Sequence, residues 1–243
     1  MNDRTTSWPW QKMNQGNAGA HEVLATLLEP KQDERWLDLG TGGGGLALLL
    51  ARSGADVVGV DVAEDGLEHA RAAAAEQGSA ATFEYADAQE LPFEDAAFTG
   101  VASAFGVIFA ADRERAAGEL ARVCAPGGKL GLTLMPLDSR TGATFTVLAR
   151  YGGSEFHPAT WPDDVHRLLG DAFELEVERR ESPVPTHPPP SWDEAVRGFG
   201  PLRAVVERLD DDGVAALRAD MEEVARRYAD RAPSYHVVLG TRR

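Results

Sequence analysis

The sequence predicts an α/β fold in which helices cover one doubly wound, mostly parallel sheet of seven strands. Three observations predict it. Short apolar runs suited to buried strands alternate with helical segments as far as Leu134. A glycine-rich turn joins the first of these runs to the next helix, and two more strand-like segments follow later in the chain. Strands that alternate with helices favour a parallel sheet with right-handed crossovers.

The first half of the chain has a regular order of elements. A helix is expected over 21–29, because HEVLATLLE has helical spacing and ends before Pro30. The β-branched run DVVGVD ends in an acid and is typical of a buried strand. Strands are expected at 35–39, 56–61, 80–86, 98–104 and 129–134, and helices at 43–52, 64–77 and 113–124.

The second half has longer helical stretches between two strands. FELEVERRE over 173–181 alternates as a strand with one wet face, and YHVVLGT over 235–241 is the last strand. Helices are expected at 139–152, 161–169, 191–208 and 211–230. We therefore expect a single domain over 1–243, with a lid segment over 1–30 and a helical cap over 182–233 inserted between the last two strands.

The net charge and the cysteine content indicate which partners and which compartment to expect. The chain has 243 residues with 24 basic and 39 acidic side chains, a net charge of −15. Such an acidic protein repels phosphate backbones and anionic membranes, so nucleic acid and membrane partners are not expected. The single cysteine, Cys124, excludes an internal disulfide and indicates a reducing compartment. The first twenty residues lack the apolar core of a signal peptide, and we expect a cytoplasmic protein.

The turn after the first strand reads DLGTGGGGLALLL. Its glycines fit a dinucleotide pattern through Gly45 and a D-x-G-x-G-x-G pattern through Gly44. Asp38 helps to choose between the two. A carboxylate beside the loop repels a pyrophosphate and attracts an ammonium or sulfonium group. The second pattern is therefore favoured, while an NAD-dependent oxidoreductase stays an alternative.

This string resembles motif I of the class I S-adenosylmethionine-dependent methyltransferases. YADAQELPFEDAAF, with Thr99 where the family often has Asp, and ARVCAPGGKL resemble further family segments. The resemblance covers about 30–135 and is closest to the ubiquinone/menaquinone-biosynthesis-like branch. It implies a Rossmann-like fold and S-adenosyl-L-methionine as cofactor.

Two carboxylates are expected to hold the nucleoside. Asp61 ends the second strand 21 residues after Gly40, the spacing at which an acid binds ribose hydroxyls. The resemblance implies that Asp87 binds the adenine amino group and that the Ala88 N–H contacts the ring. The full set expected at the cofactor is Asp38, Gly40, Thr41, Gly42, Gly44, Asp61, Val62, Asp87, Ala88, Ala104 and Phe105.

The expected reaction is an in-line displacement in which an O, N, S or C atom of a small, partly apolar molecule takes the methyl group. The loop after the fourth strand, SAFGVIFAAD, is apolar, and no metal-ligand grouping stands out. A general base is optional, with His157 and His187 as candidates. Aromatic candidates for the acceptor pocket are Trp8, Trp10, Phe105, Phe109, Tyr151 and Trp161. A non-catalytic cofactor-binding protein is the second alternative.

Overall fold

The computed structural model describes residues 10–152, 161–181 and 191–243. The strands are β1 (Arg35–Leu39), β2 (Asp56–Asp61), β3 (Thr82–Tyr85), β4 (Phe98–Ala104), β5 (Cys124–Leu134), β6 (Phe173–Glu181) and β7 (Ser234–Arg242). The helices are α1 (Trp10–Leu28), α2 (Gly45–Ala51), α3 (Glu64–Gln77), η1 (Val107–Phe109), α4 (Arg113–Val123), α5 (Arg140–Gly152), α6 (Trp161–Leu169), α7 (Trp192–Gly198), α8 (Gly200–Val206) and α9 (Asp211–Arg227).

The seven strands form one sheet in the order β3-β2-β1-β4-β5-β7-β6. All neighbouring pairs are parallel except those made by β7, which runs antiparallel to both β5 and β6. The predicted seven-stranded, mostly parallel, Rossmann-like sheet is therefore confirmed. The strand order reverses between β1 and β4, and in such sheets ligands bind beyond the carboxyl ends of the strands at this point.

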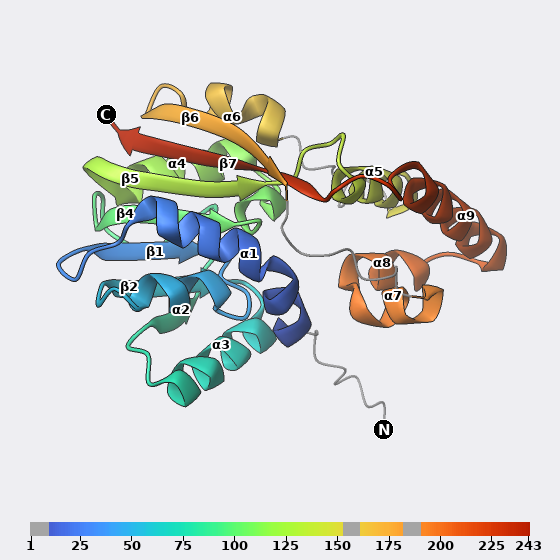
Figure 1. Ribbon diagram of the computed structural model, residues 1–243, viewed down its shortest axis with the longest axis horizontal. Helices are drawn as coiled ribbons and strands as arrows, with labels where there is room; N and C mark the ends of the chain where they lie inside the picture. Colours follow the sequence, from blue (N-terminus) through green and yellow to red (C-terminus); the bar gives the residue numbers. More distant parts are fainter. Residues whose placement is uncertain (1–9, 153–160, 182–190) are drawn as a thin grey trace.

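Helices cover both faces of the sheet (Figure 1). On one face α1, α2 and α3 enclose an apolar cluster with Trp36, Phe83 and Tyr235. On the other face α4 and α6 pack over Leu37, Phe98 and other apolar side chains of the sheet. This two-sided burial explains why the central strands read as continuous apolar runs in the sequence.

Four further helices lie beyond the carboxyl ends of the parallel strands (Figure 1). α5 follows β5, and α7, α8 and α9 lie in the chain between β6 and β7. α5 packs on α9, where the Asp220 carboxylate accepts hydrogen bonds from Arg150 and from the Tyr151 hydroxyl, both at 2.8 Å. Leu148, Leu202 and Leu217 belong to the same apolar cluster as α4, so these helices share a core with the sheet.

Local signals set several helix ends. The Asp112 side chain accepts a hydrogen bond from the Arg115 N–H at the start of α4, and Ser191 forms a capping box with Glu194 at the start of α7. Gly78 ends α3 in the left-handed conformation, as its place in the sequence predicts. No helix of the described residues has the length and apolar character required to span a bilayer.

The structure differs from the sequence-based expectation in three elements. α1 begins at Trp10 rather than at residue 21. β5 begins at Cys124, because the Pro126-Gly127-Gly128 segment is an irregularity within the strand, where the register on β4 shifts. The helix expected over 191–208 is divided at Phe199, since Pro201 favours the first turn of a new helix, α8.

Candidate functional site

The glycine loop after β1 lies directly against the segment that follows β4. Gly40 and Gly44 have φ angles of 67° and 82°, in the left-handed region that glycine tolerates. A Cβ atom on Gly40 would lie 2.6 Å from Gly106 Cα, so this approach is open only to glycine. The Ser103 hydroxyl donates to the Leu39 carbonyl at 2.6 Å and accepts from the Val107 N–H at 2.8 Å. These contacts hold the two turns together at the switch point of the sheet.

Asp38 lies beneath this loop and is only 1% exposed. Its Oδ2 accepts hydrogen bonds from the Thr41 hydroxyl at 2.7 Å and from the Ala47 N–H at 3.0 Å. Its Oδ1 is buried without a hydrogen-bond partner among the residues that the structure describes. Burial raises the pKa of Asp38 to about 7, although the two hydrogen bonds oppose this shift. Asp38 therefore anchors the loop from below and does not line the cavity above it.

Asp61 connects the glycine loop to the next helix. Its Oδ2 accepts from the Gly42 N–H at 2.8 Å, and its Oδ1 accepts from the Ala63 N–H at 2.9 Å. A carboxylate has about four acceptor positions, so each oxygen keeps one for another donor. The side chain is half-buried and faces a cavity.

Asp87 follows β3 and is held by Gln89. Asp87 Oδ1 accepts from the Gln89 backbone N–H and from the Gln89 side chain, both at 2.9 Å. These bonds lower the pKa of Asp87 below its ordinary value. Gln89 in turn accepts from the Asp112 N–H at 2.7 Å, so it connects Asp87 to the start of α4. Asp87 is ionised at neutral pH and presents an oriented acceptor.

One cavity of about 430 Å³ collects most of the side chains singled out in the sequence. The predicted residues that line it are Gly40, Thr41, Gly42, Asp61, Val62, Asp87, Ala88, Ala104 and Phe105. Gly44 and Asp38 are not among its lining residues, because both lie on the inner side of the loop. The cavity therefore joins segments from β1, β2, β3 and β4 at the carboxyl edge of the sheet.

One part of the cavity wall is apolar. It is lined by Phe109, Ala110, Ala111, Phe199 and Pro201. Phe145 of α5 contacts two of these rings, with centroids 5.4 Å from Phe109 and 5.5 Å from Phe199. Helices from the second half of the chain thus contribute to this wall.

Phe105, which lines the cavity, is held in an unusual backbone conformation. Its φ angle is 59°, which a non-glycine residue seldom adopts. Its N–H donates to the Thr133 carbonyl at 3.2 Å, and its ring meets Tyr235 edge-on at 6.0 Å. Neighbouring strands therefore fix where this ring stands, and such strain is frequent at functional sites.

Several residues of the cavity were not predicted as part of the site. Asn17 and His21 reach it from α1, and Phe199 and Pro201 reach it from the segment between β6 and β7. Gln89 has a local signal, because it stands two residues after Asp87 in the adenine-type segment. The other four are far from the motifs in the sequence, and only the fold brings them there.

Other candidates lie elsewhere. Tyr151 and Trp161 do not line the cavity, and Trp161 is fully buried in the apolar core. Trp10 is the first residue of α1. Trp8, His157 and His187 lie outside the described residues. Thr99, where the family often has Asp, exchanges hydrogen bonds with the Arg35 backbone at 2.8 and 2.9 Å, which ties β4 to β1 away from the cavity.

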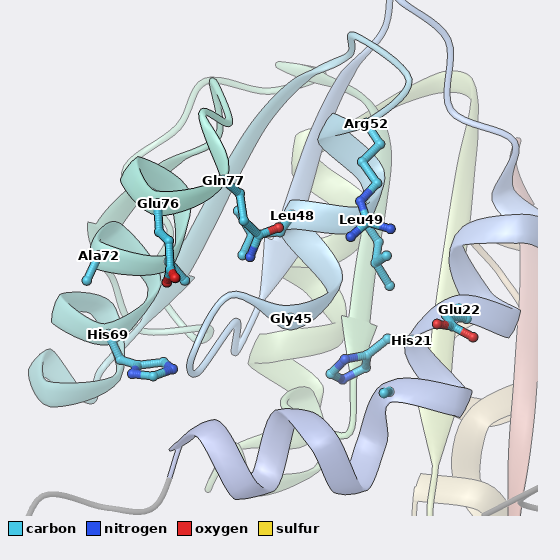
Figure 2. Close-up of a pocket in the computed structure, with 12 residues that line it drawn as sticks. His21, Glu22, Gly45, Leu48, Leu49, Arg52, His69, Ala72, Glu76 and Gln77 are labelled. Atoms are coloured by element: carbon cyan, nitrogen blue, oxygen red, sulfur yellow. The ribbon is translucent and has the colours of Figure 1, made fainter.

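A second cavity of about 600 Å³ lies between α1, α2 and α3 (Figure 2). His21 and His69 face it from α1 and α3, with the start of α2 at Gly45 between them. It is larger than the first cavity and contains none of the carboxylates expected to hold a nucleoside. We therefore place the site at the cavity above the glycine loop.

Candidate metal ligands do not cluster in the described part of the chain. No group of three His, Cys, Asp or Glu side chains there could hold a metal ion. Cys124 is buried, and burial raises the pKa of its thiol to about 11. A thiol with this pKa is a poor nucleophile at neutral pH.

Comparisons with known proteins identify the family of the chain. The family model described as "Methyltransferase domain" matches residues 37–132. The chain is 33% identical over 210 residues to a protein of Mycobacterium tuberculosis that carries no functional name, covering 80% of this chain and 75% of that one. It is 33% identical over 186 residues to 27-O-demethylrifamycin SV methyltransferase of Amycolatopsis mediterranei, covering 74% and 67%. Over 108 residues it is 49% identical to demethylmenaquinone methyltransferase of Thermus thermophilus, covering 44% and 49%.

Solved structures share the fold at lower identity. The YcgJ protein of Bacillus subtilis matches with a TM-score of 0.65 and 18% identity, over 92% of this chain and 98% of that one. Phosphoethanolamine N-methyltransferase 2 of Haemonchus contortus, in complex with S-adenosyl-L-methionine, matches with a TM-score of 0.62 and 19% identity, over 92% and 52%. The chain belongs to the class I S-adenosylmethionine-dependent methyltransferases, in the ubiquinone/menaquinone-like group, and it is an enzyme that uses S-adenosyl-L-methionine as its cofactor.

Proposed function

We propose that the enzyme transfers the cofactor's methyl group to a small, partly apolar molecule, which lies against Phe109 and the other apolar residues of the cavity wall. One observation carries this proposal. The cavity is lined by two carboxylates, Asp61 and Asp87, and by a group of apolar side chains that carry no charge. A nucleoside suits the carboxylates, and an uncharged, apolar acceptor suits the apolar group.

The residues present fit the cofactor. In our proposal Asp61 accepts hydrogen bonds from the ribose hydroxyls with its two remaining acceptor positions. Asp87 accepts from the adenine amino group, the Ala88 N–H contacts the ring, and Val62 covers the ring's face. The missing Cβ of Gly40, which would lie 2.6 Å from Gly106 Cα, lets the turns after β1 and β4 meet at the edge of this cavity.

Asp38 and the loop above it contribute charge and order. The cofactor supplies a methyl group on a cationic sulfonium. An ionised Asp38 beneath the loop attracts that cation and the cofactor's ammonium group, although it does not touch them. Because the Thr41 hydroxyl and the Ala47 N–H fix its Oδ2, the attraction acts from a preorganised position.

The chain then has to align the acceptor and exclude water. Phe105, Phe109 and Phe199 form the apolar wall along which the acceptor lies in this proposal. Displacement at an activated methyl group depends mainly on alignment, so a dedicated base is optional. His21, with a pKa lowered by burial to about 4, is a weak base.

Two parts of the chain outside the parallel strands cover the apolar part of the cavity in this proposal. We infer that α7, α8 and α9 act as the cap expected between the last two strands, since Phe199 and Pro201 already line the cavity. α1, which belongs to the proposed lid segment 1–30, contributes Asn17 and His21. In this proposal these elements close the cavity and exclude water from the reacting sulfonium.

A labelling experiment tests the acceptor class. The enzyme is incubated with a metabolite extract and cofactor labelled in its methyl group, and the products are separated by charge and polarity. We expect label in small, organic-extractable molecules, and much less of it at limiting cofactor with an Asp61→Ala variant, which binds the cofactor more weakly. Label confined to nucleic acid, to protein or to highly charged metabolites would contradict the proposal.

A further inference from the structure

Two polar side chains on α1 enter the cavity one helical turn apart. Asn17 and His21 are in an i, i+4 relation, which places them on the same face of a helix. His21 is 6% exposed, and Asn17 is half-buried. Figure 2 shows His21 directed from α1 toward the start of α2 at Gly45, beside the glycine loop. The pair therefore lines, from α1, the same cavity as the nucleoside carboxylates.

The negative charges that line the cavity are unfavourable for the carboxylate of the cofactor. Asp61 and Asp87 line it, and no lysine or arginine does so among the described residues. The methionine chain of S-adenosyl-L-methionine ends in a carboxylate as well as an ammonium group. Two carboxylates at the nucleoside end repel that anion, so it needs donors elsewhere.

The other polar side chains of the cavity are already engaged. The Thr41 hydroxyl donates to Asp38 at 2.7 Å, and the Gln89 carboxamide donates to Asp87 at 2.9 Å. Within the part of the chain that the structure describes, no hydrogen bond of the Asn17 or His21 side chain is present. Both therefore retain an N–H donor for a ligand in the cavity.

We propose that Asn17 and His21 bind the carboxylate of the cofactor's methionine chain and so fix the end of the cofactor opposite to the adenine. The inference rests on the proposed placement of the cofactor above the glycine loop. The Asn17 carboxamide supplies one N–H, and the imidazole of His21 supplies another. Because burial lowers the pKa of His21 to about 4, the ring of the free enzyme is a neutral donor at pH 7.

The role is tested with two ligands that differ only in this group. Calorimetry compares S-adenosylhomocysteine with its decarboxylated form. Loss of hydrogen bonds to a charged group predicts that the wild type binds the complete ligand about 10- to 100-fold more tightly. Asn17→Asp keeps the size of the side chain and replaces the donor by a second anion. This variant should lose most of that discrimination, because it weakens the complete ligand while the decarboxylated ligand, which keeps only its ammonium group, binds no more weakly than to the wild type.

Further variants distinguish a role of the two side chains from a general effect on α1. His21→Gln keeps a donor and should retain more of the discrimination than His21→Leu. Glu22→Gln changes a charge on the same helix at a residue that lines only the second cavity, and should leave both affinities unchanged.

A wild type that binds the two ligands equally would overturn the inference without any variant. Equal weakening of both ligands by Asn17→Asp would also overturn it, because it would show displacement of α1. No acceptor enters these measurements, so a wrong acceptor class leaves the discrimination intact. A wrong placement of the cofactor would instead appear as an Asp61→Ala variant that binds both ligands normally.

Discussion

Gly40 and Gly106 approach so closely that a Cβ on Gly106 would lie 2.6 Å from the Gly40 carbonyl oxygen and 2.7 Å from the Leu39 carbonyl oxygen. Gly106 itself has φ −81° and ψ −54°, a conformation open to any residue. The need for glycine there is therefore purely steric. It joins the turn after β1 to the turn after β4, which are the two turns that frame the proposed methyl-transfer site.

The first prediction uses this contact. Gly106→Ala should push the two turns apart and reduce S-adenosylhomocysteine affinity by about tenfold or more, since about 1.4 kcal/mol suffices for a factor of ten. Calorimetry measures the affinity. Gly118→Ala on α4 is the control, because a Cβ there meets no atom within 4 Å. It should leave affinity unchanged and raise helix stability by about 0.5–1 kcal/mol. Normal binding by Gly106→Ala would refute the argument.

The second prediction concerns Asp61. Asp61→Ala should cost about 1.5–3 kcal/mol of cofactor affinity, because charge-assisted hydrogen bonds to the ribose are lost. The variant also frees the Gly42 and Ala63 N–H groups, so Asp65→Ala, at an exposed carboxylate in the first turn of α3, is the matched control. Calorimetry measures the cofactor dissociation constant of both variants, and circular dichroism checks that they are folded. An unchanged dissociation constant in folded Asp61→Ala would exclude the role.

The third prediction is a pH dependence. The pKa of Asp38 is raised by burial to about 7 from an ordinary value near 4, so the folded state holds this proton more tightly than the unfolded state. The resulting stabilisation is fully present below about pH 4 and is lost as pH rises through about 7. The side chain at position 38 cannot ionise in the Asp38→Asn variant, so this variant should not lose stability over that pH range.

Urea unfolding of both proteins without cofactor, at about pH 5 and pH 8, measures the effect. The variant's stability relative to the wild type should rise between these values. Asp33→Asn, at an exposed carboxyl before β1, is the control and should follow the wild type. The same offset for Asp38→Asn at both pH values would show that Asp38 is already ionised in the folded protein.

The fourth prediction addresses the acceptor. Phe109 is 59% exposed although it is a large apolar side chain in the cavity wall. Phe109→Ala should raise the KM for the acceptor by about tenfold and leave the Kd of the cofactor within about twofold, because the lost contact is with the acceptor alone. Tyr85→Ala removes an aromatic ring of similar exposure that does not line the cavity, and should change neither value. A change in the cofactor Kd alone would contradict the prediction, because it would show that Phe109 contacts the cofactor and not the acceptor.

Local sequence predicted the central strands and the nucleoside carboxylates. β1, β2 and β4 begin and end at the expected residues, because apolar runs there are bounded by charged residues or loop residues. Asp61 ends β2 and Asp87 comes two residues after β3, so the position of both at the carboxyl edge of the sheet could be predicted once the strands were known.

The first half of α1 could not be predicted in the same way. Its residues include Asn14, Gly16, Asn17 and Gly19, which are poor helix formers. Leu24 and Leu28 are fully buried against α2 and the sheet, so tertiary packing holds the helix. The places of Asn17 and His21 in the cavity depend on that packing and left no local signal.

The position of β7 in the sheet has a consequence for folding during synthesis. β5 and β6 are made early but are never paired with each other, since β7 lies between them with ladders on both sides. Until Ser234–Arg242 leaves the ribosome, both strands present open edges that can pair with other chains. The nascent protein therefore has an interval of aggregation risk that ends only when β7 is inserted. Chaperone dependence should be concentrated in that interval, and variants that weaken β7 should reduce the soluble yield before they reduce activity.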